Sequence, residues 1–147
     1  MTYPAVKDSD VRYLVDTGPL VAVFNRADAW HSWAEQTFAA IEESFWTSEA
    51  VITEAAWNLG ENSPAARELL AAVDASVIRV LPAVADGAAR LALLMAKYAR
   101  MDVCDGSLVL LSERFPNGRI LTVDFRDFPI YRRFGREPLP LLMPERE

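Results

Sequence analysis

The chain has 147 residues but only one cysteine and one histidine. Cys104 alone cannot form a disulfide within the chain or build a cysteine-based zinc site, and it suits a reducing compartment, so we expect a cytoplasmic protein. His31 alone excludes the two-histidine acid–base mechanism that some nucleases use. Because it lies between Trp30 and Trp33 in an expected helix, we expect a structural or surface role for it.

Signals of several other protein classes are absent as well. The first ten residues lack the basic head and apolar stretch of a signal peptide, and no apolar run approaches the roughly 18 residues of a membrane span. There is no Gly-rich phosphate loop, and Ser107 lacks both the Gly-x-Ser-x-Gly context and a histidine partner. We therefore expect no membrane partner, no P-loop nucleotide site and no serine hydrolase chemistry.

Basic residues are in the minority, with 15 against 21 acidic ones and a net charge of −6. Such a chain does not bind nucleic acid through a broadly basic surface. Residues 1–111 hold 8 basic and 15 acidic residues, whereas residues 112–147 hold 7 arginines and 6 acids. The candidates for phosphate contacts therefore come from this C-terminal segment and from the residues just before the helix at 103–114: Lys97, Arg100, Arg126, Arg132, Arg133 and Arg136. The alternative for most of them is an ordinary solvated charged face.

What the chain does contain is two apolar runs that each lead into an aspartate. Residues 13–15 precede Asp16, and residues 120–123 precede Asp124. Short apolar runs of this kind predict buried strands, and in an open α/β fold the carboxyl ends of the strands line the ligand crevice. Two carboxylates meeting there would repel each other unless a cation lay between them. The pattern predicts an acidic pocket that holds a divalent cation.

The rest of the chain alternates between helical and strand patterns. Helices are expected at residues 19–26, from 28 onward, at 48–60, from 63 onward, at 84–98 and at 103–114, with further strands at 44–47, 77–81 and 119–123. This alternation predicts an α/β fold with helices on both faces of a mostly parallel sheet. We expect one domain over residues 1–147, with residues 1–10 as a loose leader and 137–147 as a tail. The proline-rich segment 138–144 either adds an edge strand or crosses to a partner.

Three further acids complete the candidate set. Glu54 lies in the middle of an expected helix, and Asp102 and Asp105 stand three residues apart where another helix begins. Each has an ordinary alternative, since a helical glutamate is usually exposed and an aspartate at a helix start favours the dipole. Asp16 and Asp124 could likewise be caps or turn residues. Together, however, they can meet at one end of a sheet, where their hard oxygens suit Mg²⁺ or Mn²⁺.

Four strings in this order resemble the PIN-domain family, especially the VapC-type toxins of bacterial toxin–antitoxin pairs: VDTGPLVA (residues 15–22), TEA (53–55), MDVCDGSL (101–108) and ILTVDFRDF (120–128). The resemblance spans about residues 13–133. It implies a catalytic and metal-binding quartet of Asp16, Glu54, Asp105 and Asp124, with Asp102 as an auxiliary acid at the metal. Gly106 stands where the family usually has alanine, and we expect it to loosen the start of its helix.

The resemblance further implies a Mg²⁺- or Mn²⁺-dependent endoribonuclease that hydrolyses RNA phosphodiesters. It implies a three-layer α/β/α domain with about five parallel strands, a homodimer, and a cognate antitoxin that inserts near the pocket. In this interpretation one or two ions are held by Asp16, Asp105 and Asp124. Glu54 orients a water molecule or binds the metal through a water molecule. Thr17 and Thr122 either hydrogen-bond the carboxylates or are ordinary residues at strand ends.

Two other functions stay open on the residues alone. A Mg²⁺-dependent phosphatase or phosphoacceptor domain also uses strand-end aspartates, but it would want a second acid beside Asp16, where Thr17 and Gly18 follow instead. A noncatalytic acidic interaction module would hold a partner through the arginine-bearing tail. Only assays of cleavage separate this module from the enzyme.

Overall fold

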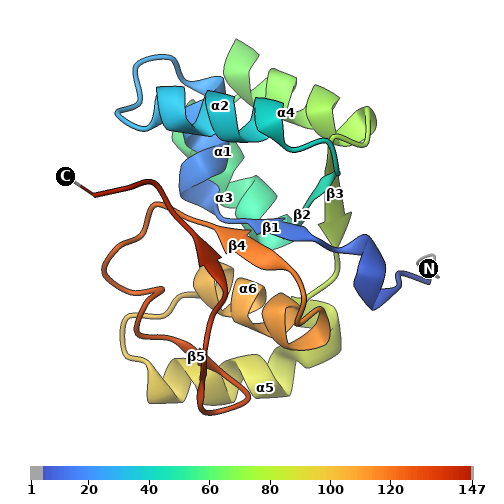
Figure 1. Cartoon of the computed structure of the whole chain (residues 1–147), viewed down its shortest axis with the longest axis vertical. Coiled ribbons are helices and arrows are strands. Elements are labelled where there is room, and N and C mark those ends of the chain that lie inside the picture. Colours follow the sequence, from blue (N-terminus) through green and yellow to red (C-terminus); the bar gives the residue numbers. More distant parts are fainter. Residues whose placement is uncertain (1–4, 147) are drawn as a thin grey trace.

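The structure, a computed structural model, describes residues 5–146. Its centre is a five-stranded sheet in the order β3-β2-β1-β4-β7, in which all neighbouring pairs are parallel (Figure 1). The strands are β1 (Tyr13–Val15), β2 (Phe45–Ser48), β3 (Ile78–Leu81), β4 (Arg119–Leu121) and β7 (Leu141–Leu142). The predicted parallel α/β fold is therefore confirmed.

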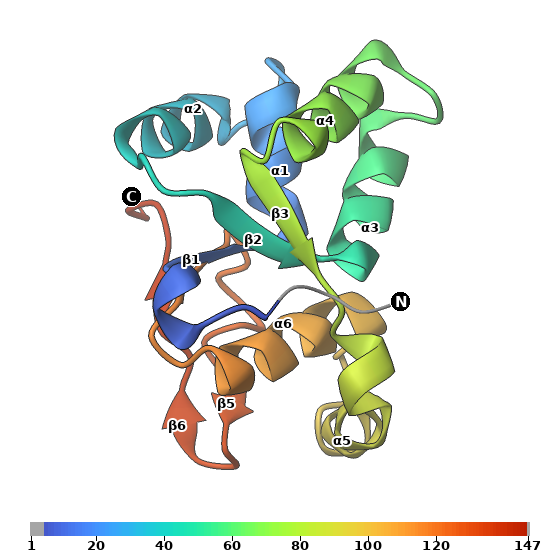
Figure 2. The same ribbon diagram turned by 90° about the vertical axis from the view of Figure 1, so that its right-hand side faces the viewer.

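Helices cover both faces of this sheet (Figures 1 and 2). One layer contains α1 (Thr17–Phe24), α2 (His31–Ala40), α3 (Glu49–Leu59) and α4 (Pro64–Asp74), and the other contains α5 (Val84–Lys97) and α6 (Val103–Arg114). This is the expected three-layer α/β/α arrangement. Within residues 5–146, no helix is both long enough and apolar enough to cross a bilayer.

Local capping explains most helix boundaries. The side chains of Ser48 and Ser63 accept hydrogen bonds from backbone N–H groups of the first turns of α3 and α4, at 3.2 and 3.0 Å, as the sequence predicted. Gly60 ends α3 at a φ of 105°, a conformation that glycine adopts without strain. The start of α1 lies two residues before the predicted one, because Asp16 caps it. The start of α2 lies later than predicted, because the Asp28 side chain holds a turn by accepting from the Trp30 N–H.

The C-terminal segment contains one element that was predicted as an alternative and one that was not. The tail adds a parallel edge strand, with Leu141 opposite Ile120 of β4. Before it, β5 (Arg132–Arg133) and β6 (Glu137–Pro138) form a small antiparallel hairpin, which turns through Phe134 and Gly135 at φ values of 52° and 75°. Of the expected leader, residues 1–4 lie outside the described residues, while Asp8–Asp10 form the 3₁₀ helix η1.

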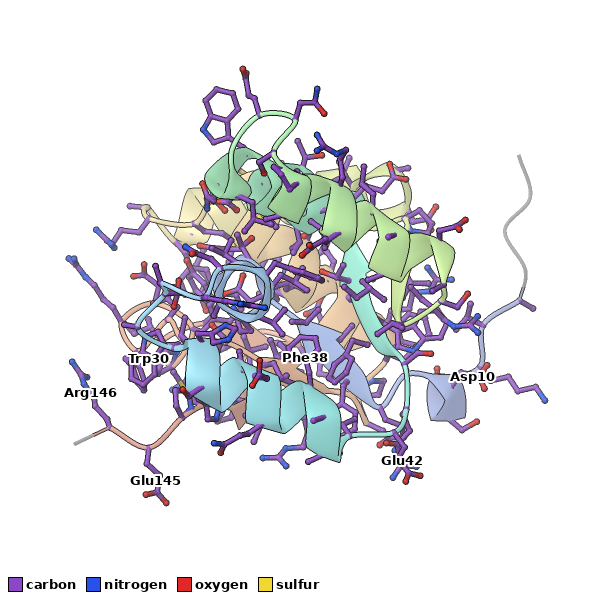
Figure 3. The ribbon with its side chains drawn as sticks, turned by 90° about the horizontal axis from the view of Figure 1, so that it is seen from above. Asp10, Trp30, Phe38, Glu42, Glu145 and Arg146 are labelled. Atoms are coloured by element: carbon purple, nitrogen blue, oxygen red, sulfur yellow. The ribbon has the colours of Figure 1, made fainter. Side chains whose placement is uncertain are left out.

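The core lies on both sides of β1 and β4, where four residues are fully buried: Leu14, Val15, Ile120 and Leu121. Burial on both faces explains why these strands are uninterrupted apolar runs. Phe38 reaches from α2 toward the sheet, and its ring stacks on Phe45 of β2 with centroids 4.2 Å apart (Figure 3).

The expectation that Gly106 loosens its helix is wrong. Gly106 is buried within the regular helix α6, and a Cβ atom there would overlap the side chain of Leu91 from α5. The glycine instead permits α5 and α6 to pack closely, which fixes the start of α6 against its neighbour.

Candidate metal centre

The sheet topology brings two of the predicted acids to the same place. In the sheet, β2 and β3 lie on one side of β1, and β4 and β7 lie on its other side. Such a switch point opens a crevice at the carboxyl ends of the strands. Asp16 directly follows β1, and Asp124 follows β4 after two intervening residues. Both acids therefore lie at this crevice.

A pocket of about 360 Å³ occupies the crevice, and four predicted acids line it: Asp16, Glu54, Asp105 and Asp124. Glu54 comes from the second turn of α3, and Asp105 comes from the first turn of α6. Asp102 does not line this pocket. Its Oδ1 instead accepts the Asp105 N–H at 2.8 Å and so caps α6, the ordinary alternative for an aspartate at a helix start.

Asp28 and Asn58 also line the pocket, although neither is among the residues that the sequence predicts there. The local signal at Asp28 is that of a turn residue, since its Oδ1 accepts the Trp30 N–H at 2.8 Å. Asn58 lies one turn after Glu54 on α3, at a spacing of four residues. Residues four apart lie on the same face of a helix, so the position of Asn58 relative to the candidate Glu54 is a sequence signal that could have indicated it.

Asp16 is the most buried of the acids, with 7% of its surface exposed. Its Oδ1 accepts from the Thr17 N–H and its Oδ2 accepts from the Thr122 hydroxyl, both at 2.8 Å. Burial raises the pKa of Asp16 to about 6, and repulsion from Asp124 and Glu54 adds to this rise, while the two hydrogen bonds oppose it. Thr122, which follows β4, thus orients the Asp16 carboxylate through its hydroxyl.

Asp105 has a different set of contacts. Its Oδ2 accepts a hydrogen bond from the Tyr131 hydroxyl at 2.9 Å. Burial raises the pKa of Asp105 to about 7, and the charges of Asp102, Asp16 and Asp124 raise it further, against the lowering effect of the tyrosine. The Asp105 carboxyl therefore holds a proton more readily than an isolated carboxyl does.

The remaining two acids are also fixed by neighbouring donors. The Thr17 hydroxyl donates to Glu54 Oε2 at 3.1 Å, and Cys104 Sγ lies 3.4 Å from the same hydroxyl. Burial, with a hydrogen bond to Glu54, raises the pKa of the Cys104 thiol well above its usual range. Asp124 Oδ1 accepts two N–H groups of the following turn, at 3.0 and 2.9 Å.

The four carboxylates line one pocket, but they do not converge on a single metal-binding position. Among residues 5–146, no three acidic, histidine or cysteine side chains form a ready-made metal cluster. Like charges repel, and each acid makes its hydrogen bonds to a protein donor instead. The all-oxygen donor set nevertheless fits Mg²⁺ or Mn²⁺, because Mg²⁺ usually binds one or two carboxylates and keeps several waters.

Two residues that could have indicated other chemistry have structural roles. His31 Nδ1 lies 2.7 Å from the Ala22 carbonyl oxygen, and its Nε2 lies 3.3 Å from a Glu35 carboxylate oxygen. Ser107 is buried, and its hydroxyl lies 2.7 Å from that of Ser48. Neither residue lines the acidic pocket.

An apolar hollow of about 630 Å³ adjoins the acidic pocket and shares Glu54 with it. Trp57 and Val103 line the hollow, and they are 67% and 43% exposed. The polar residues Thr53, Glu54 and Asp102 also line the hollow. An exposed apolar patch rimmed by polar residues is typical of a surface that contacts another molecule.

Three of the predicted phosphate-contacting arginines make contacts within the protein. Arg133 is only 13% exposed and donates to backbone carbonyls at the end of α6 and at Pro116, so it holds the hairpin in place. Arg132 donates to three nearby carbonyls, and Arg100 pairs with Asp127 at 2.9 Å.

Two other arginines, Arg126 and Arg146, are exposed. Arg126 is exposed two residues after Asp124 and has no ion pair within the described part of the chain. Arg146 lies over the Phe125 ring at 5.1 Å, and Trp30 packs against the same ring at 5.6 Å. Figure 3 shows Trp30 and Arg146 on the same side of the molecule. This group places accessible positive charge on the residues that follow Asp124.

Comparison with known families identifies the fold. The family model of the PIN domain matches residues 13–113, which run from β1 almost to the end of α6. The chain belongs to the PIN-domain family. The matched residues include Asp16, Glu54 and Asp105 and end before Asp124. No curated protein matches the chain.

Solved structures of VapC and VapBC proteins have a similar fold. VapC20 of Mycobacterium tuberculosis, described as a sarcin–ricin loop cleaving toxin, has a TM-score of 0.61 and 20% identity over 74% of this chain and 86% of that one. VapBC2 of Rickettsia felis, bound to a promoter DNA fragment, has a TM-score of 0.58 and 15% identity over 92% and 100%. DNA-bound VapBC of Salmonella typhimurium has a TM-score of 0.55 and 15% identity over 90% and 98%. At these identities the similarity concerns the fold.

Proposed function

We propose that this PIN domain is a Mg²⁺- or Mn²⁺-dependent endoribonuclease and the toxin of a toxin–antitoxin pair. The observation that carries the proposal is the pocket at the carboxyl end of the sheet, where acids from four separate segments meet. The fold similarity to a toxin described as cleaving the sarcin–ricin loop, and to two VapBC proteins, supports the choice of RNA and of an antitoxin partner.

Asp16, Asp105 and Asp124 would hold the cation, with Glu54 beside them and Asp102 as an auxiliary acid just outside the pocket. Bound there, a divalent cation would neutralise charge on a phosphate and lower the pKa of a water. Glu54, which Thr17 and Cys104 hold in place, would orient the attacking water. The Thr122 hydroxyl and the Thr17 N–H hold Asp16 in one orientation, so its oxygens are already placed when RNA arrives.

Accessible arginines outside the pocket would bind the RNA backbone, because the pocket itself repels phosphate. Arg126 and Arg146 flank the segment that begins at Asp124, and Arg136 is exposed on the hairpin turn. Phosphate contacts of this kind weaken steeply with added salt. The apolar hollow around Trp57 would receive the cognate antitoxin beside the acids. We further propose that the toxin is a cytoplasmic homodimer.

The test is cleavage of a random-sequence single-stranded RNA pool and of ribosomal RNA. Wild-type protein should cleave in Mn²⁺ or Mg²⁺ and stop in EDTA. Asp105→Asn should lower the rate at least 100-fold, as removal of groups that act in the transition state typically does. Asp74→Asn is the matched control, because Asp74 is an exposed aspartate at the end of α4, and it should cleave normally.

Equal cleavage by wild-type protein and Asp105→Asn would remove Asp105 from the catalytic role. If wild-type protein failed to cleave with either metal, the noncatalytic interaction module would replace the enzyme. Formation of an acyl phosphate on Asp16 would instead establish the phosphoacceptor alternative.

A further inference from the structure

Tyr131 does not line the acidic pocket, but it contacts one of the acids that do. It comes from a segment that lies outside the matched residues 13–113 and holds none of the predicted acids. The residue is only 2% exposed, and its hydroxyl donates to Asp105 Oδ2 at 2.9 Å. Its ring makes edge contacts with Tyr98 and Phe128, at centroid distances of 5.1 and 5.3 Å. The ring is therefore fixed by packing while its hydroxyl contacts a single acid.

The turn that begins at Asp124 carries Tyr131 to this position. Asp124 Oδ1 accepts two backbone N–H groups of the turn, and the Asp127 carbonyl accepts the Tyr131 N–H at 3.2 Å. The Asp127 carboxylate also pairs with Arg100, at 2.9 Å, just before the start of α6. Asp124 therefore shapes the turn that carries Tyr131, and Tyr131 in turn contacts Asp105.

We propose that Tyr131 is a positioning residue for Asp105, holding Oδ2 so that the other carboxylate oxygen is presented to the divalent cation. That second oxygen has no hydrogen-bond partner within residues 5–146. The inference rests on the proposed metal-dependent function and adds to it a residue outside the acidic set. Groups that orient a metal ligand through a hydrogen bond typically change metal affinity 10- to 100-fold when they are removed.

Tyr98 provides a matched control within the same aromatic cluster. Its hydroxyl accepts the Arg132 N–H at 3.1 Å and, within residues 5–146, makes no hydrogen bond to an acid. Tyr131→Phe and Tyr98→Phe each remove one hydroxyl and one hydrogen bond while they keep the ring. Only Tyr131→Phe removes a hydrogen bond to Asp105, whereas Tyr98→Phe removes one to Arg132.

The experiment measures Mn²⁺ binding directly, by electron paramagnetic resonance of free Mn²⁺ and by calorimetry, without RNA. Tyr131→Phe should bind Mn²⁺ about 10-fold more weakly than wild-type protein, and Tyr98→Phe should stay within about 2-fold. In an Asp105→Asn background, Tyr131→Phe should cause no further loss, because its effect acts through that carboxylate. Retained affinity in Tyr131→Phe, with binding by wild-type protein, would overturn the positioning role alone. Absence of Mn²⁺ binding by wild-type protein would overturn the proposed function itself.

A second readout does not require a folded Tyr131 variant. With 3-fluorotyrosine at all tyrosine positions, the ¹⁹F resonance of Tyr131 should move on addition of Mg²⁺, because its hydroxyl contacts a ligand acid. The resonances can be assigned by replacing the other tyrosines singly with phenylalanine. A Tyr131 resonance that stays unchanged while Mg²⁺ raises the melting temperature would contradict the proposal.

Discussion

Replacing Asp16 with asparagine should stabilise the metal-free protein near neutral pH, although the residue lies in the centre of the proposed site. Asp16 is 7% exposed, and burial raises its pKa from 3.8 to about 6. The folded state therefore holds the proton of this carboxyl more tightly than the unfolded chain does. Stability falls as pH rises from about 4, and the full penalty is present above pH 6.

The size of the effect follows from the two pKa values. The difference between 3.8 and about 6 corresponds to about 3 kcal/mol of folding free energy above pH 7. Asparagine carries no charge, but it has one side-chain acceptor where Asp16 uses two, and the lost hydrogen bond costs about 1 kcal/mol. Asp16→Asn should therefore gain about 2 kcal/mol at pH 7–8, or roughly 4–8 °C in melting temperature. Below pH 4 it should be the less stable protein by about 1 kcal/mol.

The assay is urea and thermal unfolding of both proteins in EDTA from pH 4 to pH 8, with Asp74→Asn as a control that changes a distant exposed aspartate. The measurement is then repeated with Mn²⁺. At a concentration 100 times the dissociation constant, wild-type protein should gain about 2.7 kcal/mol, and Asp16→Asn should gain far less. A stability difference that stays constant across the pH range would refute the raised pKa. An equal gain from Mn²⁺ in both proteins would refute the role of Asp16 as a ligand.

Two other predictions follow from packing and charge. Gly106→Ala should lower stability by about 1–3 kcal/mol, since its Cβ would overlap Leu91, and urea unfolding should show a much smaller penalty in a Leu91→Ala background. Arg133→Ala should lower stability by about 1–3 kcal/mol because partly buried carbonyls lose their donor, whereas Arg126→Ala should leave unfolding unchanged and weaken RNA binding with a shallower salt dependence. If the two arginine variants showed the same loss of stability, this division of roles would be wrong.

The sequence was informative wherever the signal was local. An apolar run followed by aspartate predicted the end of β1, and serine caps predicted the starts of α3 and α4. The convergence of Asp16 and Asp124 could also be predicted, because parallel strands place their carboxyl ends at one edge of the sheet. These inferences needed only strand direction and capping chemistry.

Other features depended on contacts between distant segments and could not be read from the chain. Tyr131 has no neighbouring sequence signal, because its partner lies 26 residues away and is reached through a turn and an aromatic cluster. Arg133 appears in sequence as one of several C-terminal arginines, and only its burial against α6 shows that it is structural. The effect of Gly106 depends on packing against Leu91 of another helix rather than on helix propensity, so its immediate sequence does not indicate it.

The same burial that makes Asp16 costly for folding would give the pocket its affinity for a cation. An exposed carboxylate is already stabilised by water and gains little when an ion arrives, whereas a buried one beside other acids gains the whole of the repulsion that the ion removes. Substitutions that stabilise the metal-free protein at Asp16 should therefore weaken cation binding, and the two changes should be opposite in sign. This opposition distinguishes a metal site from a structural cap, because replacing a structural cap would lower stability and leave Mn²⁺ affinity unchanged.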